Sequence, residues 1–131
     1  MYFNVFEIYF NKPDFYVRNM LAEIIDGLGL ETCVTYAGQK FVDLVTAKKD
    51  DRLLVSLINT GGIYSEARLQ AYDEIQPLAN LTVTIKTGKP PKSVTLQPEN
   101  IAPNYCYDAA SKTVTVTIYH LHIHTVVAMD F

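Results

Sequence analysis

The chain has 131 residues, the length of one globular domain, and its apolar share of 49% lies outside the range of disordered proteins. Its charged share is 19% and its formal net charge is -3, which gives no basic surface for nucleic acid. No apolar stretch approaches the roughly 20 residues that cross a bilayer, and Met1 to Phe10 lacks the features of a signal peptide. We therefore predict one soluble domain over residues 1–131, with no nucleic-acid or membrane partner, and favour the cytoplasm.

The N-terminal part combines an extended segment with a helix. Residues Tyr2 to Phe10 are mostly aromatic or β-branched, which predicts that they pair as a strand or lie along a sheet. A helix is predicted over residues 11–29, because a proline lies in its first turn and Gly27 and Gly29 offer left-handed positions that end it. Its apolar residues recur at helical spacing: Val17, Met20, Leu21, Ile24, Ile25 and Leu28.

Residues 31–131 carry short strand candidates separated by turn residues. The candidates are Thr32 to Tyr36, Phe41 to Ala47, Arg52 to Asn59, Asn80 to Thr87, Lys92 to Gln97 and Thr113 to Met129. Leu53 to Ile58 is nearly continuously apolar, which predicts a central strand covered on both faces. The pattern predicts a mostly β fold, an antiparallel β-sandwich of about seven or eight strands with one N-terminal α-helix.

The last candidate strand, Thr113 to Met129, changes the phase of its alternation. Its apolar residues occupy even positions up to Ile118 and odd positions afterwards. A flat strand cannot present both sets to one core, because successive side chains point to opposite faces. We expect a bulge or sharp bend near Tyr119 and His120, of the kind that sandwiches use where a strand passes between sheets.

Three histidines, His120, His122 and His124, alternate within this stretch and would share one face of a strand. Alternate residues lie about 6.8 Å apart, so two neighbours such as His120 and His122 could bind a metal, whereas three in line make a poor tetrahedral set. The competing interpretation is a polar strand face. We expect no metal and no cofactor, and a metal-dependent enzyme using His120 and His122 is the hypothesis to exclude.

The sequence carries no catalytic motif. Cys33 and Cys106 match no close metal-ligand spacing and are expected to be buried free thiols. Most acidic residues fall in turns or on solvent faces, where acids normally lie, and no nucleophile elbow or phosphate loop is present. We therefore predict no catalytic residue and no enzymatic activity for the chain on its own.

Sugar binding without catalysis is the alternative that the aromatic residues raise. The chain has nine tyrosines, and those in predicted loops or edges are Tyr64, Tyr72, Tyr105 and Tyr107. Exposed rings of this kind could stack on sugar faces and form a carbohydrate-binding module with a glycan partner. The competing interpretation is that the rings cover the end of the sandwich with their hydroxyls in water. The absence of tryptophan weighs against the module.

Four segments share their strand pattern with a known family: Arg52 to Asn59, Glu74 to Lys86, Ser93 to Pro98 and Thr113 to Met129. They resemble the closing β domain of large multidomain glycoside hydrolases. In those enzymes a catalytic barrel precedes a glutamine-amidotransferase-like domain, as in the β-galactosidase trimerisation region, and this all-β tail follows. Residues 16–28 resemble the helix that closes the middle domain. The family often has a proline-containing turn where this chain has Tyr119 and His120.

The resemblance implies a structural role. The chain contains neither the barrel nor the middle domain, which hold the catalytic acids, so no catalytic residue maps onto it. What carries over is position: Asn59 as a turn residue after a buried strand, Pro77 before the next strand and His124 near the start of the last one. The leading hypothesis is a non-catalytic accessory β-sandwich domain that packs on companion domains or subunits of a carbohydrate-active enzyme. Without them the helix stripe would be uncovered, so a homo-oligomer is also expected.

Overall fold

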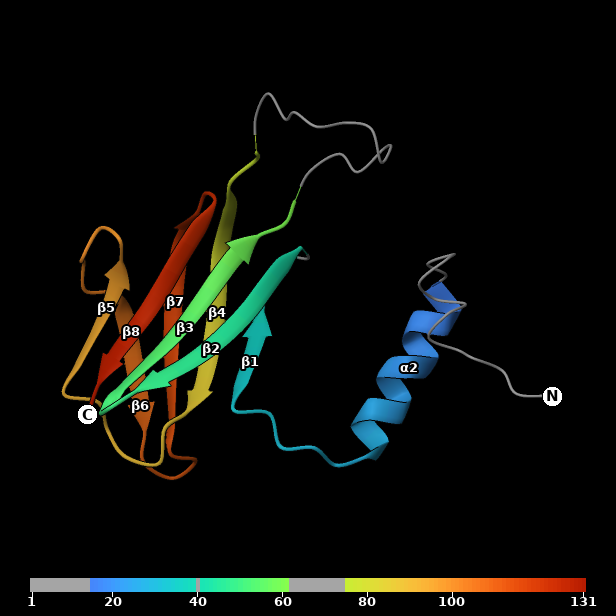
Figure 1. The fold of residues 1–131 in the computed structure, drawn as a ribbon, viewed down its shortest axis with the longest axis horizontal. Coiled ribbons are helices and arrows are strands. Elements are labelled where there is room, and N and C mark those ends of the chain that lie inside the picture. Colours follow the sequence, from blue (N-terminus) through green and yellow to red (C-terminus); the bar gives the residue numbers. More distant parts are fainter. Residues whose placement is uncertain (1–14, 40, 62–74) are drawn as a thin grey trace. The chain divides into compact units, whose positions relative to one another are not determined.

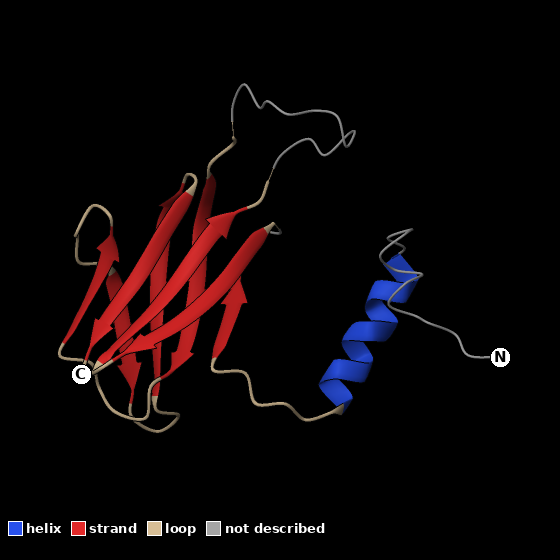
Figure 2. Ribbon diagram, in the orientation of Figure 1, coloured by secondary structure: helices blue, strands red, loops and turns tan. Residues whose placement is uncertain are grey.

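The computed structural model describes residues 15–39, 41–61 and 75–131 (Figure 1). The chain forms two compact units, Met1–Thr32 and Cys33–Phe131. In the described residues, the first unit contains the helix α2 (Phe15–Gly27) and the second contains all eight strands (Figure 2). The extended segment predicted for residues 2–10 and the predicted helix start at residue 11 lie outside the described residues.

Helix α2 ends as its sequence predicts. The Leu28 N–H donates to the carbonyl of Ile24 at 3.2 Å, and Gly29 adopts a left-handed φ of 61°. Leu21 is its one buried residue and Val17 is half-buried, while Met20, Ile24 and Ile25 are exposed, the last two at 52% each. No helix among the described residues is long and apolar enough to cross a membrane.

The eight strands form two antiparallel sheets that face each other. The strands are β1 (Val34–Ala37), β2 (Val42–Lys49), β3 (Arg52–Asn59), β4 (Leu78–Lys86), β5 (Ser93–Gln97), β6 (Asn104–Asp108), β7 (Thr113–Leu121) and β8 (His124–Asp130). One sheet, called the β1 sheet here, has the order β1-β4-β7-β6, and the other, the β2 sheet, has the order β2-β3-β8-β5 (Figure 1). The predicted antiparallel β-sandwich is confirmed.

The core lies between the two sheets and is aliphatic. Every second residue of the central strands points into it, as the period of two in a strand requires. Its fully buried members include Val55 and Leu57 from β3, Val83 and Ile85 from β4, Val114, Val116 and Ile118 from β7, and Val127 and Met129 from β8. Because a slip of one residue would turn each set outward, burial fixes the register of both sheets.

The last predicted strand is two strands. β7 ends at Leu121 in the β1 sheet, and β8 begins at His124 in the β2 sheet. The change of phase lies where the alternation predicts it, since Ile118 and Leu121 are buried while Tyr119 and the next residue are exposed. The sheet change itself follows three residues later. A separate strand, β6, was not predicted, because only five residues of mixed polarity form it.

Strand β3 is central, as predicted, and the described residues of the sandwich cover one of its two faces. It pairs with β2 on one side and β8 on the other. Val55 and Leu57 face the core with no exposed surface, whereas Ile58 on the opposite face is 36% exposed. The continuous apolar run therefore corresponds to one buried face and one face that the described residues leave open.

We predict that adjacent residues of β3 differ sharply in their contribution to stability. Leu57→Ala should lower the free energy of unfolding by about 2 to 5 kcal/mol, because it opens a cavity between the sheets. Ile58→Ala, the matched control, should cost less than about 1 kcal/mol. Urea unfolding followed by circular dichroism measures both, and equal losses would contradict the assignment of faces.

Candidate functional site

The outer faces of the two sheets differ in chemistry. On the outer face of the β1 sheet, the registers of strand pairing align two rows, Thr35–Thr84–Thr115–Cys106 and Ala37–Thr82–Thr117–Asn104. The hydroxyl oxygens of Thr84 and Thr115 lie 3.4 Å apart. Threonine suits a wet strand face, because it combines a β-branched shape with a polar group. This face is therefore adapted to water.

The outer face of the β2 sheet is apolar at its centre. Pairing aligns Ala47, Leu54 and Ala128 in one row across β2, β3 and β8, and Val45, Ser56 and Val126 in the next. We call the surface formed by Val45, Ala47, Leu54, Ile58 and Val126 the apolar face, in which Ala128 itself is buried with 3% of its surface exposed. Val45 is 54% exposed, and neither Leu54 nor Val126 packs against the core cluster. A contiguous exposed apolar surface commonly marks an interaction site.

A charged row borders the apolar face at one end. The residues Lys49, Arg52, Asp130 and Ser93 lie side by side on β2, β3, β8 and β5. The Arg52 Nε donates to the Asp130 carboxylate at 2.6 Å, and the Ser93 hydroxyl donates to its other oxygen at 2.9 Å. These two hydrogen bonds lower the pKa of Asp130 below its usual value.

Asn59 joins three segments at the opposite end of β3. Its side chain is almost buried, and its Nδ2 donates to the carbonyls of His122 at 2.7 Å and Gln76 at 2.9 Å. Its Oδ1 accepts the Gly61 N–H at 2.9 Å, so the side chain also bonds to the backbone two residues on. The Asn59 amide thus makes three hydrogen bonds to the backbone, two as a donor and one as an acceptor. Asn59 therefore fixes both the β7–β8 connection and the approach to β4.

The three histidines do not share one strand. His120 lies on β7, His122 lies in the connection and His124 begins β8 in the other sheet. The prediction of a common strand face is therefore wrong, because the chain changes sheets between the first and the third ring. In the described ranges, no group of three His, Cys, Asp or Glu side chains could hold a metal ion.

The tyrosines predicted for sugar binding are placed only in part. Tyr64 and Tyr72 lie outside the described residues. Tyr105 and Tyr107 alternate on the same side of β6, where Tyr105 is 43% exposed and Tyr107 packs against the core. A stacking platform that includes Tyr107 would need its ring free of the core, so of the two described candidates only Tyr105 presents an exposed ring. The carbohydrate-binding module stays a prediction.

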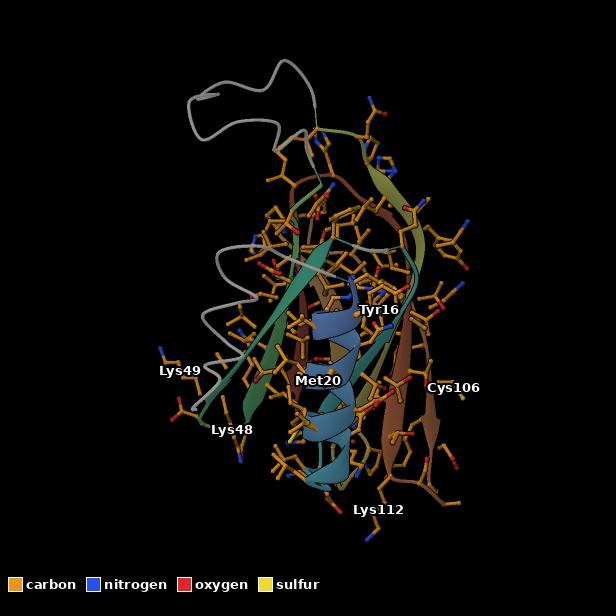
Figure 3. All side chains as sticks on the ribbon, turned by 90° about the vertical axis from the view of Figure 1, so that its right-hand side faces the viewer. Tyr16, Met20, Lys48, Lys49, Cys106 and Lys112 are labelled. Carbon is orange, nitrogen blue, oxygen red and sulfur yellow. The ribbon has the colours of Figure 1, made fainter. Side chains whose placement is uncertain are left out.

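Both cysteines are free, as predicted, but they are exposed rather than buried. Cys106 projects from β6 on the threonine-rich outer face (Figure 3). β6 is an edge strand, and its outer side chains have a neighbouring strand on one side only. The expectation of burial came from the general preference of free cysteine, and the edge position overrides it.

A hollow of about 340 Å³ lies where the β2–β3 turn meets the end of β8. Its lining includes Lys48, Arg52, Lys86 and Lys89 around the ring of Phe131, with Lys89 Nζ 5.6 Å from the ring centroid. The sequence patterns did not identify this group, because its cations come from the ends of β2, β3 and β4 and from the turn after β4. Among the described residues that line it, Asp51 is the acidic side chain.

We predict that Asn59→Asp destabilises the sandwich by about 2 to 4 kcal/mol at neutral pH. The change keeps the shape and the acceptor for Gly61, but a carboxylate cannot donate to the carbonyls of Gln76 and His122. Asn104→Asp is the matched control, because the Asn104 amide donates to the Tyr119 hydroxyl in an exposed position. Its cost should stay below about 1 kcal/mol in the same urea titration. Equal destabilisation by Asn59→Asp and Asn104→Asp would contradict the conclusion that Asn59 joins the three segments.

Asp130 should make the fold sensitive to acid. Because its folded pKa is lowered, its stabilising contribution is complete above the unfolded pKa of about 3.9 and is lost as the pH falls through the folded value. Urea midpoints measured from about pH 6 to about pH 2.5 should therefore fall more steeply for the parent than for Asp130→Asn. Glu99→Gln, at an exposed turn, should keep the parent slope. A parent slope in Asp130→Asn would contradict the argument.

The similarity of this chain to known proteins lies in its structure. No protein-family model matches the chain, and no curated protein matches it. Among solved structures, the chain is similar over its whole length to alpha-L-fucosidase isoenzyme 2 from Paenibacillus thiaminolyticus, with a TM-score of 0.82 and 18% identity. A cycloisomaltooligosaccharide glucanotransferase from Paenibacillus sp. matches 74% of the chain with a TM-score of 0.48 and 16% identity, too low for any argument. The chain spans 20% of the fucosidase and 18% of the glucanotransferase. The fucosidase comparison establishes a shared fold, that of a β domain in a larger glycoside hydrolase.

Proposed function

We propose that this chain is a non-catalytic accessory β-sandwich domain of a carbohydrate-active assembly, and that it packs on companion domains or subunits. The observation that carries the proposal is the fucosidase match, which covers 100% of this chain but only 20% of the larger one. A fold that occurs as one fifth of an enzyme has neighbours there, and its outer surfaces are then built to be covered.

The open surfaces of the described residues support this proposal. The apolar face lies on strands whose inner residues fill the core, and Val45, Leu54 and Val126 stay outside that core cluster. A catalytic domain of the same assembly is the occupant that we assign to it. The near-continuous apolar sequence of β3 is typical of a strand covered on both faces, and a companion domain would supply the missing cover.

The carboxylates support a role without catalysis. A glycosidase needs a general acid whose pKa is raised, together with a second carboxylate at a defined separation. In the described part of the chain, the carboxyl groups with a resolved shift are Asp108 and Asp130, and hydrogen bonds lower the pKa of both. The hydroxyl of Ser111 and the N–H of Ala110 bond to Asp108 within its own turn. Hydrogen bonds of this kind favour the ionised form, the opposite of what a general acid needs.

We predict that Val126→Lys abolishes association with the companion. The chain is coexpressed with a tagged candidate companion, a glycoside hydrolase chain from the same genome, and co-purification is measured on that tag. A lysine at the centre of the apolar face should lower recovery by at least about tenfold, because a buried charge disrupts an interface core. Thr84→Lys, at the equivalent position on the threonine-rich face, should recover like the parent.

Two outcomes contradict the proposal. Equal recovery of the parent and Val126→Lys would show that the apolar face is not covered in the assembly. Turnover of 4-nitrophenyl glycosides by the purified chain alone, α-L-fucoside included, would contradict the non-catalytic role. Thermal unfolding of both lysine variants serves as the folding check, since a surface substitution should leave the transition near that of the parent.

A further inference from the structure

The four sheet edges are protected unequally. β1 has four residues, and β5 and β6 have five each. β5 is followed by Pro98, and both backbone groups of Leu96 are taken by Ile101 at 2.7 and 3.2 Å. β2 is different: it has eight residues, and among the described residues it pairs on one side only, with β3. A long unpaired edge is a template for another strand.

The backbone groups of β2 that face outward can be identified from the pairing. The Thr60 N–H donates to the carbonyl of Phe41 at 2.8 Å, in register with the β2–β3 ladder. Hydrogen-bonded pairs alternate along an antiparallel ladder, so the odd-numbered residues of β2 bond to β3. The N–H and C=O groups of the even-numbered residues Val42, Leu44, Thr46 and Lys48 therefore point away from the sheet. The central residues Leu44 to Ala47 carry no charge that would guard this edge.

From this edge we infer that a second copy of the chain pairs with β2. The two β2 strands run antiparallel about a two-fold axis at Thr46, which joins two four-stranded sheets into one of eight strands. An isologous contact of this kind needs a surface that complements itself. β2 has such a surface, because its acidic and basic outer residues lie at equal distances from Thr46.

The charges select this register. With Thr46 opposite its own copy, Asp43 of each strand lies opposite Lys49 of the other on the outer face, and Val45 lies opposite Ala47. Neither Asp43 nor Lys49 forms an ion pair with another described residue of its own chain. Figure 3 shows Lys49 at the end of β2, extending away from the ribbon. Opposite charges directly across an antiparallel pair stabilise it, and like charges destabilise it.

The neighbouring registers are less complementary. Hydrogen bonding between the two β2 strands requires that even-numbered residues of one copy lie opposite even-numbered residues of the other. The two-fold axis can therefore pass through a residue but not between two residues. An axis at Ala47 sets Asp43 opposite Asp51, and an axis at Leu44 sets Asp43 opposite the apolar Val45. An axis at Val45 sets Asp43 opposite Ala47, which leaves the charges unmatched. In the Thr46 register the apolar faces of both copies also become continuous through Val45 and Ala47.

A charge swap tests the register with the full chain. Sedimentation equilibrium should show a dimer, and Asp43→Lys or Lys49→Asp should raise its dissociation constant by about tenfold, because each creates two like-charge pairs. The double variant Asp43→Lys/Lys49→Asp should restore the parent value. Lys112→Asp, which makes the same change of charge in the β6–β7 turn, should leave the dimer unchanged.

Each outcome decides the proposal. A chain that stays monomeric at high micromolar concentration overturns it. A dimer that resists both single substitutions forms through another surface, such as the exposed stripe of α2, and also overturns it. Weakening without restoration in the double variant overturns the Thr46 register.

Cross-linking provides a second test that does not depend on charge. In a background with Cys33→Ser and Cys106→Ser, Thr46→Cys should form an intermolecular disulfide when diamide oxidises the two thiols. Residues on the axis lie about 5.5 Å apart between Cα atoms, within disulfide range. Thr84→Cys in the same background should stay monomeric on a non-reducing gel. Equal cross-linking of the two would overturn the inference.

Discussion

Burial of one aliphatic residue in every two along the central strands is the constraint on which this structure depends. It fixes the register of both sheets, and with them the identity of every outward-facing residue. The chain is then free to give the two outer faces different chemistry. Threonines line one face, and apolar residues with a charged border line the other. The threonine-rich face of the β1 sheet suits contact with water, and the apolar face of the β2 sheet suits contact with another protein surface.

Much of the sandwich could be predicted because alternation is a strong signal. β3 was predicted with its observed bounds, and the phase change at Tyr119 was read from residue parity alone. β6 was not predicted, because none of its five residues is fully buried and the neighbours Tyr105 and Cys106 are both exposed. Its sequence therefore shows no alternation of apolar and polar residues. The break between β7 and β8 was missed by three residues, because the sequence around His122 carries no glycine or proline.

The candidate surface was less visible in the sequence than the fold. A continuous apolar run such as Leu53 to Ile58 shows that both faces of a strand avoid water, but not what covers each face. Pairing supplied the rest, since it places Val45 and Val126 beside β3 on one surface. The ion pair of Arg52 and Asp130 joins residues that are 78 positions apart, a distance at which local pattern carries no information.

Asn59 has a consequence for how this scaffold can change. Its side-chain amide bonds to Gly61 at one end and to Gln76 at the other end of the sequence between them. These two bonds hold the ends together and offset part of the entropy lost on closing that segment. For a flexible segment, closure between two such anchors becomes costlier by only about 0.6 kcal/mol per doubling of length. The two anchors therefore weigh more in the free energy of closure than the number of residues between them.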